Sequence, residues 1–433
     1  MNAGRASDTL KKGVRKLQRG LYLSAKANPA RSYGNLYDKV YRCDVLREAW
    51  SRVSRNGGSA GVDGVSMGWI RQYGVEKYLE ELGTILREKR YRPNRIRRVY
   101  IPKPDGRQRP LGIPTVMDRV VQMAVKIVIE PLYEADFLDC SYGFRPRRSA
   151  HQAIEKIDEC LRRGFRWVVD VDLQSYFDTI PHDRLLEQVK RRVHDRTLVR
   201  LIRQWLKAGI LVDGRVDYPD RGSPQGGVLS PLLSNLYLHE VDRQFPRRGT
   251  KVHLVRYADD LLILCGTEAD ARDAYARLTR VVNDLGLTLN AEKTRVLHAE
   301  TGFDFLGFSF RPGTYQRNGR QRTLLIKVPR RRALEGIRQR IKDAVKFTPL
   351  NEAVRTAVNA VNARLKGWTN YFRIGRLYPF LKGLVWHAEK QLRLFLRRKF
   401  QRKYSQGTRC TYPPQYLHEH LGLYTVPQLY GGR

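Results

Sequence analysis

The sequence has no run of 18 or more apolar residues, no Cys-x-x-Cys pair and no long low-complexity tract. Without a long apolar run no transmembrane helix is expected, and the N-terminus lacks the apolar core of a secretory signal. Cysteines are few and scattered, which predicts reduced, buried thiols in a cytosolic compartment and no structural zinc site. The five cysteines are Cys43, Cys140, Cys160, Cys265 and Cys410. The length of 433 residues is enough for two or three domains.

Negative charge is also scarce, with 43 Asp and Glu against 81 Lys and Arg and a formal net charge of +38. Such self-repulsion is best explained by a polyanion that neutralises it. The 23 tyrosines suit stacking on bases, although most tyrosines in any protein simply pack. The balance therefore favours a nucleic acid over a membrane surface as the partner. The denser basic clusters are Lys11-Lys12, Arg15-Lys16, Arg330-Arg331-Arg332 and Arg397-Arg398-Lys399.

The most informative segment is residues 252–265, in which Asp259 and Asp260 lie between two apolar runs. Short runs rich in Val, Leu, Ile and Tyr are typical of buried strands, so a tight turn would place both carboxylates at a hairpin tip. Adjacent carboxylates repel each other, and a divalent metal ion relieves that repulsion. An ordinary acidic turn remains the alternative, because Asp is common in turns.

A second acidic strand is expected at residues 167–173, which are apolar except for Asp170 and Asp172. Residues two apart on a strand share a face, so both side chains point the same way. A carboxylate within an apolar strand needs a compensating charge or hydrogen bonds. Beside the Asp259-Asp260 hairpin, this strand would gather three carboxylates around two cations, the arrangement of two-metal phosphoryl transfer.

The pattern of elements divides the chain into regions. Residues 1–35 predict a basic arm with an amphipathic helix, and residues 36–315 an α/β or α+β body. Within the body, residues 97–114 predict a hairpin and residues 118–133 a helix. Residues 311–329, with one short strand at 323–328, are expected to connect the body to three amphipathic helices with basic polar faces. The tail after residue 405 has no assignment from its pattern.

Eight short motifs follow one another along the chain. They are residues 56–64 (Asn-Gly-Gly-Ser-Ala-Gly-Val-Asp-Gly), 101–106 (Ile-Pro-Lys-Pro-Asp-Gly), 141–146 (Ser-Tyr-Gly-Phe-Arg-Pro), 172–178, 223–227 (Ser-Pro-Gln-Gly-Gly), 257–260 (Tyr-Ala-Asp-Asp), 305–308 (Phe-Leu-Gly-Phe) and 365–372 (Leu-Lys-Gly-Trp-Thr-Asn-Tyr-Phe). Each alone is a weak signal. In this order, over nearly the whole chain, they resemble a bacterial group II intron-encoded reverse transcriptase, also called a maturase.

The resemblance implies a right-hand polymerase. Fingers and palm, with an antiparallel palm sheet, would occupy residues 36–315. An α-helical thumb or maturase domain would occupy 316–404, after the basic arm of residues 1–35. The tail, 405–433, would be a candidate remnant of a DNA-binding region. The nuclease domain of many relatives, with its His and paired Cys residues, has no counterpart here, as in the compact members of the family.

The resemblance also implies roles for individual residues. Asp172, Asp259 and Asp260 match the catalytic carboxylates that bind two Mg²⁺ ions, and Asp172 is preferred to Asp170 because Phe177 and Asp178 follow it at the family's spacing. The residues matching the site of the deoxynucleoside triphosphate are Lys103, Arg109, Phe177, Gln225 and Lys293. Phe177 matches the aromatic gate against a 2′-hydroxyl, with a core Phe as the alternative. Lys103 and Arg109 match triphosphate-gripping cations, with solvated surface charges as the alternative. Gln174 departs from the family's usual Lys, which puts only local contacts in doubt.

The expected function is RNA-directed DNA polymerase activity combined with binding of the intron RNA to assist splicing. The expected partners are the intron RNA, an RNA template with a DNA primer, and target DNA, with no membrane. RNA contacts are expected from Lys11, Lys12, Arg15, Arg330, Arg331 and Arg332, although the last three could instead form a solvated helix start. The protein would be cytoplasmic in a bacterium and associated with the nucleoid during integration.

Two alternative functions stay open. One is an RNA-binding splicing cofactor with a vestigial polymerase, which the complete carboxylate set argues against. The other is a domesticated reverse transcriptase in a defence or diversity-generating system, which the Ser-Pro-Gln-Gly-Gly segment and the maturase-like thumb argue against.

Overall fold

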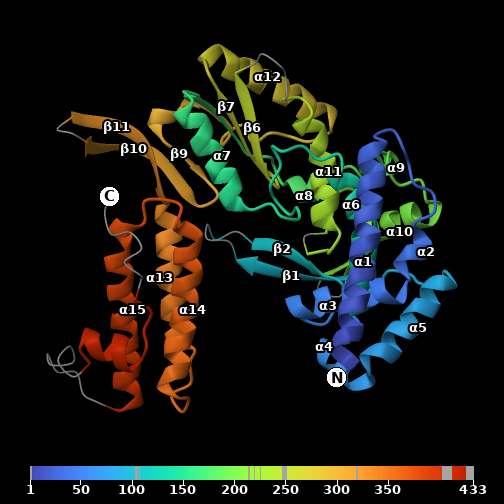
Figure 1. Cartoon of the computed structure of the whole chain (residues 1–433), viewed down its shortest axis with the longest axis horizontal. Helices are drawn as coiled ribbons and strands as arrows, with labels where there is room; N and C mark the ends of the chain where they lie inside the picture. Colours follow the sequence, from blue (N-terminus) through green and yellow to red (C-terminus); the bar gives the residue numbers. More distant parts are fainter. Residues whose placement is uncertain are drawn as a thin grey trace. The chain divides into compact units, whose positions relative to one another are not determined.

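The structure is a computed structural model that describes residues 2–102, 106, 108–212, 215–218, 220–224, 226–245, 251–317, 320–401 and 412–425, with the backbone alone for 2–10, 212, 315–317 and 320–324. The chain forms two compact units (Figure 1). The first comprises Met1–Cys160 and Val168–Val296, and the second Leu161–Trp167 and Leu297–Arg433. The predicted limits of arm, body, thumb and tail do not follow from this division and stay predictions.

Five helices precede the first strand, helices and strands are mixed from β1 to β11, and the elements after β11 are helical. The helices are α1 (Asn2–Ala27), α2 (Tyr37–Val40), α3 (Cys43–Asn56), α4 (Met67–Tyr73), α5 (Val75–Arg87), α6 (Val116–Glu134), α7 (Ala150–Arg162), α8 (Tyr176–Thr179), α9 (His182–Lys190), α10 (Arg196–Leu206), α11 (Ser230–Asp242), α12 (Glu268–Asp284), α13 (Arg331–Lys346), α14 (Val354–Phe372) and α15 (Tyr378–Lys399), with short turns η1 (Ala299–Thr301) and η2 (Tyr416–His420). The strands are β1 (Ile96–Pro102), β2 (Gln108–Ile113), β3 (Trp167–Val171), β4 (Ile210–Val212), β5 (Arg215–Asp217), β6 (Val252–Tyr257), β7 (Asp260–Cys265), β8 (Arg295–His298), β9 (Phe303–Phe305), β10 (Phe308–Arg317) and β11 (Arg320–Pro329).

Helix α6 is the core of the first unit, because it is apolar on nearly every side and α1 and α3 pack on it. The hydroxyl of Thr115 accepts a hydrogen bond from the backbone N–H of Asp118 at 3.1 Å, which caps the helix start. The predicted helix at 118–133 is confirmed. The basic arm is also a helix, and it is held to α6 by its buried Val14 and Leu21 and by Gln18, whose amide donates to the Ile127 carbonyl at 3.1 Å.

One four-stranded sheet lies in the first unit, and a second lies there except for Trp167 and the last two residues of β8. The strand order of one is β2-β1-β4-β5, and its β1–β2 hairpin confirms the prediction for residues 97–114. Lys103 lies outside the described residues. The order of the other is β6-β7-β3-β8, so the two predicted acidic segments are neighbours in one sheet.

The second unit contains the antiparallel sheet β11-β10-β9 and the helices α13, α14 and α15, which pack on one another. The three predicted helices are confirmed. The expectation of one short strand in 311–329 was wrong, because β10 and β11 pair along ten residues each. Phe308 is fully buried with its ring centroid 4.8 Å from that of Phe372, so the Phe-Leu-Gly-Phe turn packs on the end of α14.

Residues 412–425 of the tail fold back onto this bundle. The buried Glu389 of α15 accepts from Arg393 at 3.0 Å and lies 3.2 Å from the imidazole Nε2 of His418. Residues 405–411 and 426–433 of the tail lie outside the described residues.

Two predictions about composition can be compared with the structure. In the described parts of the chain no helix is both long and apolar enough to span a membrane. Among the described residues, Cys43, Cys140, Cys160 and Cys265 form no disulfide. Cys160 and Cys265 are buried as expected, whereas Cys140 is half-buried and Cys43, at the start of α3, is exposed.

Candidate active site

The predicted hairpin around Asp259 and Asp260 is confirmed. In the β6–β7 register Tyr257 pairs with Asp260, so Ala258 and Asp259 form a two-residue turn. Ala258 has φ of +59°, in the left-handed region that such tight turns require. Asp259 is half-buried in the turn, and Asp260 is exposed as the first residue of β7.

Asp172 is the residue after β3, the strand beside β7. Its backbone carbonyl accepts a hydrogen bond from the backbone N–H of Asn290 at 2.8 Å, and its own N–H donates to the hydroxyl of Thr294 at 3.3 Å. Its carboxylate lies 3.2 Å from the ammonium of Lys293. The segment that contains Lys293 therefore holds Asp172 at the edge of the sheet.

Asp172 and Asp259 are close enough for their charges to interact. Burial raises the pKa of Asp259, the negative charge of Asp172 raises it further, and the Arg109 guanidinium lowers it. Arg109 is in β2, where it pairs with Ile101. The structure thus brings together two of the predicted carboxylates and one predicted triphosphate-binding cation.

The donor set fits Mg²⁺, because protein sites for this ion usually supply one or two carboxylates and leave the other positions to waters and substrate phosphates. Within the described ranges, no three His, Cys, Asp or Glu side chains are grouped as a complete protein metal site. Asp260 as a third ligand stays a prediction. Asp170 lies within β3. Its carboxylate is 3.5 Å from the Arg295 guanidinium, so it is paired with a cation other than Lys293.

A buried ion pair that was not predicted from the sequence lies next to the Ala258-Asp259 turn. Arg256 and Asp242 are both fully buried, with 2.5 Å between Nη2 and Oδ2. Arg256 also donates to the Asn235 amide oxygen at 2.9 Å and to the Ala258 carbonyl at 3.0 Å. Arg256 stands in an apolar strand, and a charge there needs a buried partner. The position of Arg256 in an apolar strand could have predicted a buried ion pair, but the sequence does not indicate which acidic residue is the partner.

The Ser-Tyr-Gly-Phe segment lies against the same turn. A Cβ on Gly143 would be 2.4 Å from the backbone nitrogen of Ala258, so no larger residue fits. The Gly143 carbonyl accepts from the Asn235 side chain at 2.7 Å. This motif therefore shapes the Tyr-Ala-Asp-Asp turn.

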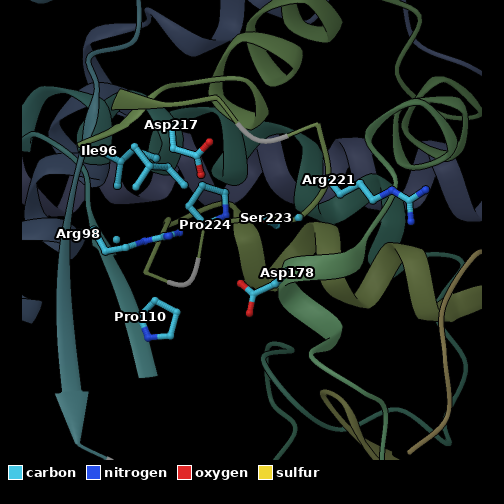
Figure 2. Close-up of a pocket in the computed structure, with 11 residues that line it drawn as sticks. Ile96, Arg98, Pro110, Asp178, Asp217, Arg221, Ser223 and Pro224 are labelled. Atoms are coloured by element: carbon cyan, nitrogen blue, oxygen red, sulfur yellow. The ribbon is translucent and has the colours of Figure 1, made fainter. Parts of the chain in front are cut away.

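Phe177 is half-buried in the single turn α8, and its carbonyl accepts from the backbone N–H of Ser223 at 2.7 Å. Gln225 lies outside the described residues. The residues just before it line a cavity of about 240 Å³ together with Asp178 and residues of β1, β2, β4 and β5. Figure 2 shows Ser223 and Pro224 between the β1–β2 hairpin and Asp178.

The predicted RNA-binding residues fall on two helix surfaces. Lys11, Lys12 and Arg15 are exposed on α1. The second group, Arg330, Arg331 and Arg332, forms the start of α13. Cations are unfavourable beside the positive end of a helix dipole. Arg331 has partial compensation from Glu335, 2.9 Å away.

Comparison with known families decides the classification. Residues 101–310 match the family described as "Reverse transcriptase (RNA-dependent DNA polymerase)", and residues 334–411 match "Group II intron, maturase-specific domain". The chain belongs to the group II intron-encoded reverse transcriptases. It combines an RNA-directed DNA polymerase domain with a maturase-specific domain, as the resemblance implied.

Curated relatives agree with this classification. "Protein YkfC" of Escherichia coli is 36% identical over 335 residues, 68% of this chain and 87% of that protein. "Group II intron-encoded protein LtrA" of Lactococcus lactis is 32% identical over 361 residues, 67% of this chain. "Putative COX1/OXI3 intron 1 protein" of Saccharomyces cerevisiae is 27% identical over 440 residues, 82% of this chain. The chain spans 60% of the length of LtrA and 52% of that of the yeast protein.

Among solved structures, a chain of a "Partial Cas6-RT-Cas1--Cas2 complex" is 22% identical over 57% of this chain and 42% of its own length, with a TM-score of 0.36. This similarity is too low to support an argument about fold or function.

Proposed function

We propose that this reverse transcriptase extends a DNA primer on an RNA template at Asp172, Asp259 and Asp260, and that its basic surfaces bind the intron RNA to assist splicing. The observation that supports the polymerase site most directly is that the charges of Asp172 and Arg109 both act on the pKa of Asp259. Two carboxylates facing a fingers cation can hold a metal-bound triphosphate between them. Target DNA is the further substrate of the same site during integration.

The reaction is attack of the primer 3′-hydroxyl on the α-phosphate of a deoxynucleoside triphosphate, with pyrophosphate leaving. Asp172 and Asp259, with Asp260, would hold two Mg²⁺ ions, which supply charge that stabilises the attacking and leaving oxygens. Arg109 and Lys103 bind the triphosphate oxygens, Arg109 as a bidentate donor. Lys293 keeps the Asp172 carboxylate oriented through their ion pair. Gln225 is followed by two glycines in the sequence, and a turn there would let the backbone approach the nucleotide closely.

The alternatives are a splicing-only maturase and a domesticated reverse transcriptase. The electrostatic interaction between Asp172 and Asp259 and the buried Arg256 next to the turn argue against a vestigial polymerase. The maturase-specific match at residues 334–411 argues for the intron family over a defence system. Inspection of the flanking DNA for sequence that encodes a group II intron RNA would distinguish an intron-encoded protein from a domesticated reverse transcriptase. We place the protein in the bacterial cytoplasm, associated with the nucleoid during integration.

Sugar selection gives a test of the gate. Replacing Phe177 with alanine should raise ribonucleotide incorporation relative to deoxyribonucleotide incorporation, because the ring would exclude the 2′-hydroxyl by its volume. We expect the ratio of the two kcat/KM values to move by about tenfold to a hundredfold, which is 1.4 to 2.7 kcal/mol of discrimination. Tyr176→Phe is the matched control, since its ring is buried in the core rather than facing the nucleotide. An unchanged ratio in Phe177→Ala would make Phe177 a packing residue.

RNA binding should depend strongly on salt. Each neutralised phosphate contributes a slope of about −0.7 to −0.9 to the plot of log K against log salt concentration. Replacing Arg330, Arg331 and Arg332 with glutamate should weaken binding and flatten this plot, and splicing assistance should fall with it. The same change in Lys11, Lys12 and Arg15 should act in the same direction.

The control for the triple variant is glutamate at three other exposed arginines, Arg243, Arg272 and Arg280, which equals it in net charge. Filter binding at several salt concentrations compares the two. Equal slopes for both triple variants would mean that the start of α13 is a solvated surface. An affinity that hardly changed with salt, even for the unmodified protein, would contradict a polyanion as the partner.

A further inference from the structure

We propose that His182 is a positioning residue for nucleotide selection: it ties the loop that leads into Gln225 to the single-turn helix that presents Phe177. This inference rests on the proposed polymerase function and adds a residue to which the sequence motifs assigned no role. His182 is not among the predicted metal ligands or nucleotide-binding residues. Its effect would pass through the backbone of Gly222.

The contact itself is short and buried. His182 is the first residue of α9 and is 3% exposed. Its imidazole Nε2 lies 2.6 Å from the carbonyl oxygen of Gly222. A carbonyl oxygen can only accept, so the proton of this bond belongs to Nε2. No hydrogen-bond partner of Nδ1 is found in the part of the chain that the structure describes.

Burial lowers the pKa of His182, and the positive charge of Lys207 lowers it as well. The hydrogen bond to Gly222 and the charges of Asp220 and Asp183 act in the opposite direction, but the pKa stays below its ordinary value. The imidazole is therefore neutral at neutral pH and has a single N–H to donate. With the proton on Nε2, the ring keeps one hydrogen bond, and that bond goes to Gly222. The interaction at Gly222 is thus the hydrogen-bonding role of this side chain.

Two backbone hydrogen bonds extend the connection toward the gate. The N–H of Gly222 donates to the Ile180 carbonyl at 2.8 Å, and the N–H of Ser223 donates to the Phe177 carbonyl at 2.7 Å. Gly222 has φ of +92°, and a Cβ there would be 3.0 Å from the carbonyl oxygens of Phe177 and Asp178. The loop and α8 are therefore in direct contact along several atoms, and a shift of Gly222 would move both.

The far end of the loop reaches the fingers hairpin. A Cβ on Gly226 would be 2.2 Å from the Gly112 carbonyl oxygen in β2. The Gln122 side-chain oxygen accepts from the backbone N–H of Val228 at 2.9 Å and so fixes the loop's exit. His182 and Gln122 thus contact Gly222 and Val228, which precede and follow Gln225 in the sequence. In Figure 2 the entry of this loop, Ser223 and Pro224, lies between the hairpin and α8.

The alternative is that His182 only fills space in the core. Two substitutions separate the possibilities. In His182→Gln the amide nitrogen can occupy nearly the position of Nε2 and donate to Gly222, whereas the shorter side chain of His182→Asn cannot reach it. Both remove the ring, so a packing role would make both defective. A positioning role makes glutamine a substitute and asparagine a defective variant.

The experiment measures single-nucleotide primer extension on an RNA template with matched deoxyribonucleotide and ribonucleotide, for the full chain and the two variants. We expect His182→Asn to raise KM for the deoxyribonucleotide about tenfold and to reduce sugar discrimination by a similar factor, because a buried carbonyl loses its donor. We expect kcat to change much less. His182→Gln should restore both quantities to within about threefold of the unmodified protein.

Leu185→Ala, a cavity in the same helix at a fully buried position, is the control for loss of stability. Thermal unfolding of each variant accompanies the kinetics. The proposal is overturned if His182→Asn keeps KM and discrimination, if glutamine fails to restore them, or if Leu185→Ala alters them as strongly at an equal loss of Tm. An unmodified protein without primer extension would instead overturn the proposed polymerase function, so the two failures are distinguishable.

Discussion

Primer extension should be lost when either Asp172 or Asp259 is replaced with asparagine. The amide keeps the size of the side chain but removes the charge that would hold the metal-bound triphosphate. We expect a fall of about 10³-fold or more in kcat/KM, equivalent to about 4 kcal/mol of transition-state stabilisation. The measurement is extension of a DNA primer on an RNA template with Mg²⁺ present, and RNA binding, measured in parallel, should survive.

Asp170→Asn is the matched control for this experiment. Asp170 is on the same strand, two residues before Asp172, but its carboxylate is 3.5 Å from Arg295. We expect its loss to leave most of the activity. Near-normal extension by the Asp172 or Asp259 variant would remove the metal-site assignment, and equal loss in the Asp170 variant would mean that the choice between the two strand carboxylates was wrong.

Breaking the buried pair beneath the turn should cause the largest loss of stability. In Asp242→Asn the Arg256 guanidinium would stay buried without its counter-charge. Removing one partner of a buried ion pair typically costs about 3–5 kcal/mol of unfolding free energy. Chemical or thermal unfolding of the purified protein measures this loss. Because Arg256 also donates to the Ala258 carbonyl, we expect the remaining folded protein to be impaired in primer extension.

The pair also makes the stability depend on pH. Burial by itself would raise the pKa of Asp242, but the Arg256 charge and hydrogen bonds lower it below its ordinary value. A folded-state pKa below the unfolded one contributes stability above the unfolded pKa, and that stability is lost as the pH falls through the folded one. In the Asp242→Asn variant, the free energy of unfolding should lack the part that falls with pH because Asp242 becomes protonated.

An exposed pair provides the comparison. Arg272 and Glu268 on α12 are 2.6 Å apart, but their side chains are 75% and 44% exposed. Glu268→Gln should cost about 0.5 kcal/mol or less, because such i,i+4 pairs contribute little in water. A similar loss for both variants would show that the Arg256–Asp242 pair has no special importance for the turn.

Local patterns in the sequence predicted the elements that present the site. The two short apolar runs on either side of Asp259 and Asp260 predicted the β6–β7 hairpin, and the helical spacing of apolar residues predicted α13, α14 and α15. These signals are local, because the helices bury one face of their own sequence and the two strands are apolar along most of their length. The β10–β11 hairpin was underestimated, since its Gly, Pro and polar residues hide a pairing that becomes visible only when both strands are aligned.

The long-range partners were not predictable in this way. Arg256 in its apolar strand indicates a buried charge, but its partners Asp242 and Asn235 belong to a separate helix, α11. His182 reads as an ordinary helix start, and its partner Gly222 is 40 residues away. Nothing in a local window indicates which carbonyl a buried imidazole will meet, because that depends on how α9 and the loop pack.

By itself, the sequence determined the chemical class of this protein: the excess of positive charge, the acidic strand and turn, and the ordered motifs all lie in local stretches that physics or resemblance can interpret. Tertiary structure decided which of these groups interact. It placed β3 beside β7, so that the charge of Asp172 acts on the pKa of Asp259. It also paired Asp170 with Arg295. It also supplied the buried contacts under the turn and the loop. Those contacts join residues far apart in the chain, where burial strengthens charges and hydrogen bonds that water would otherwise weaken.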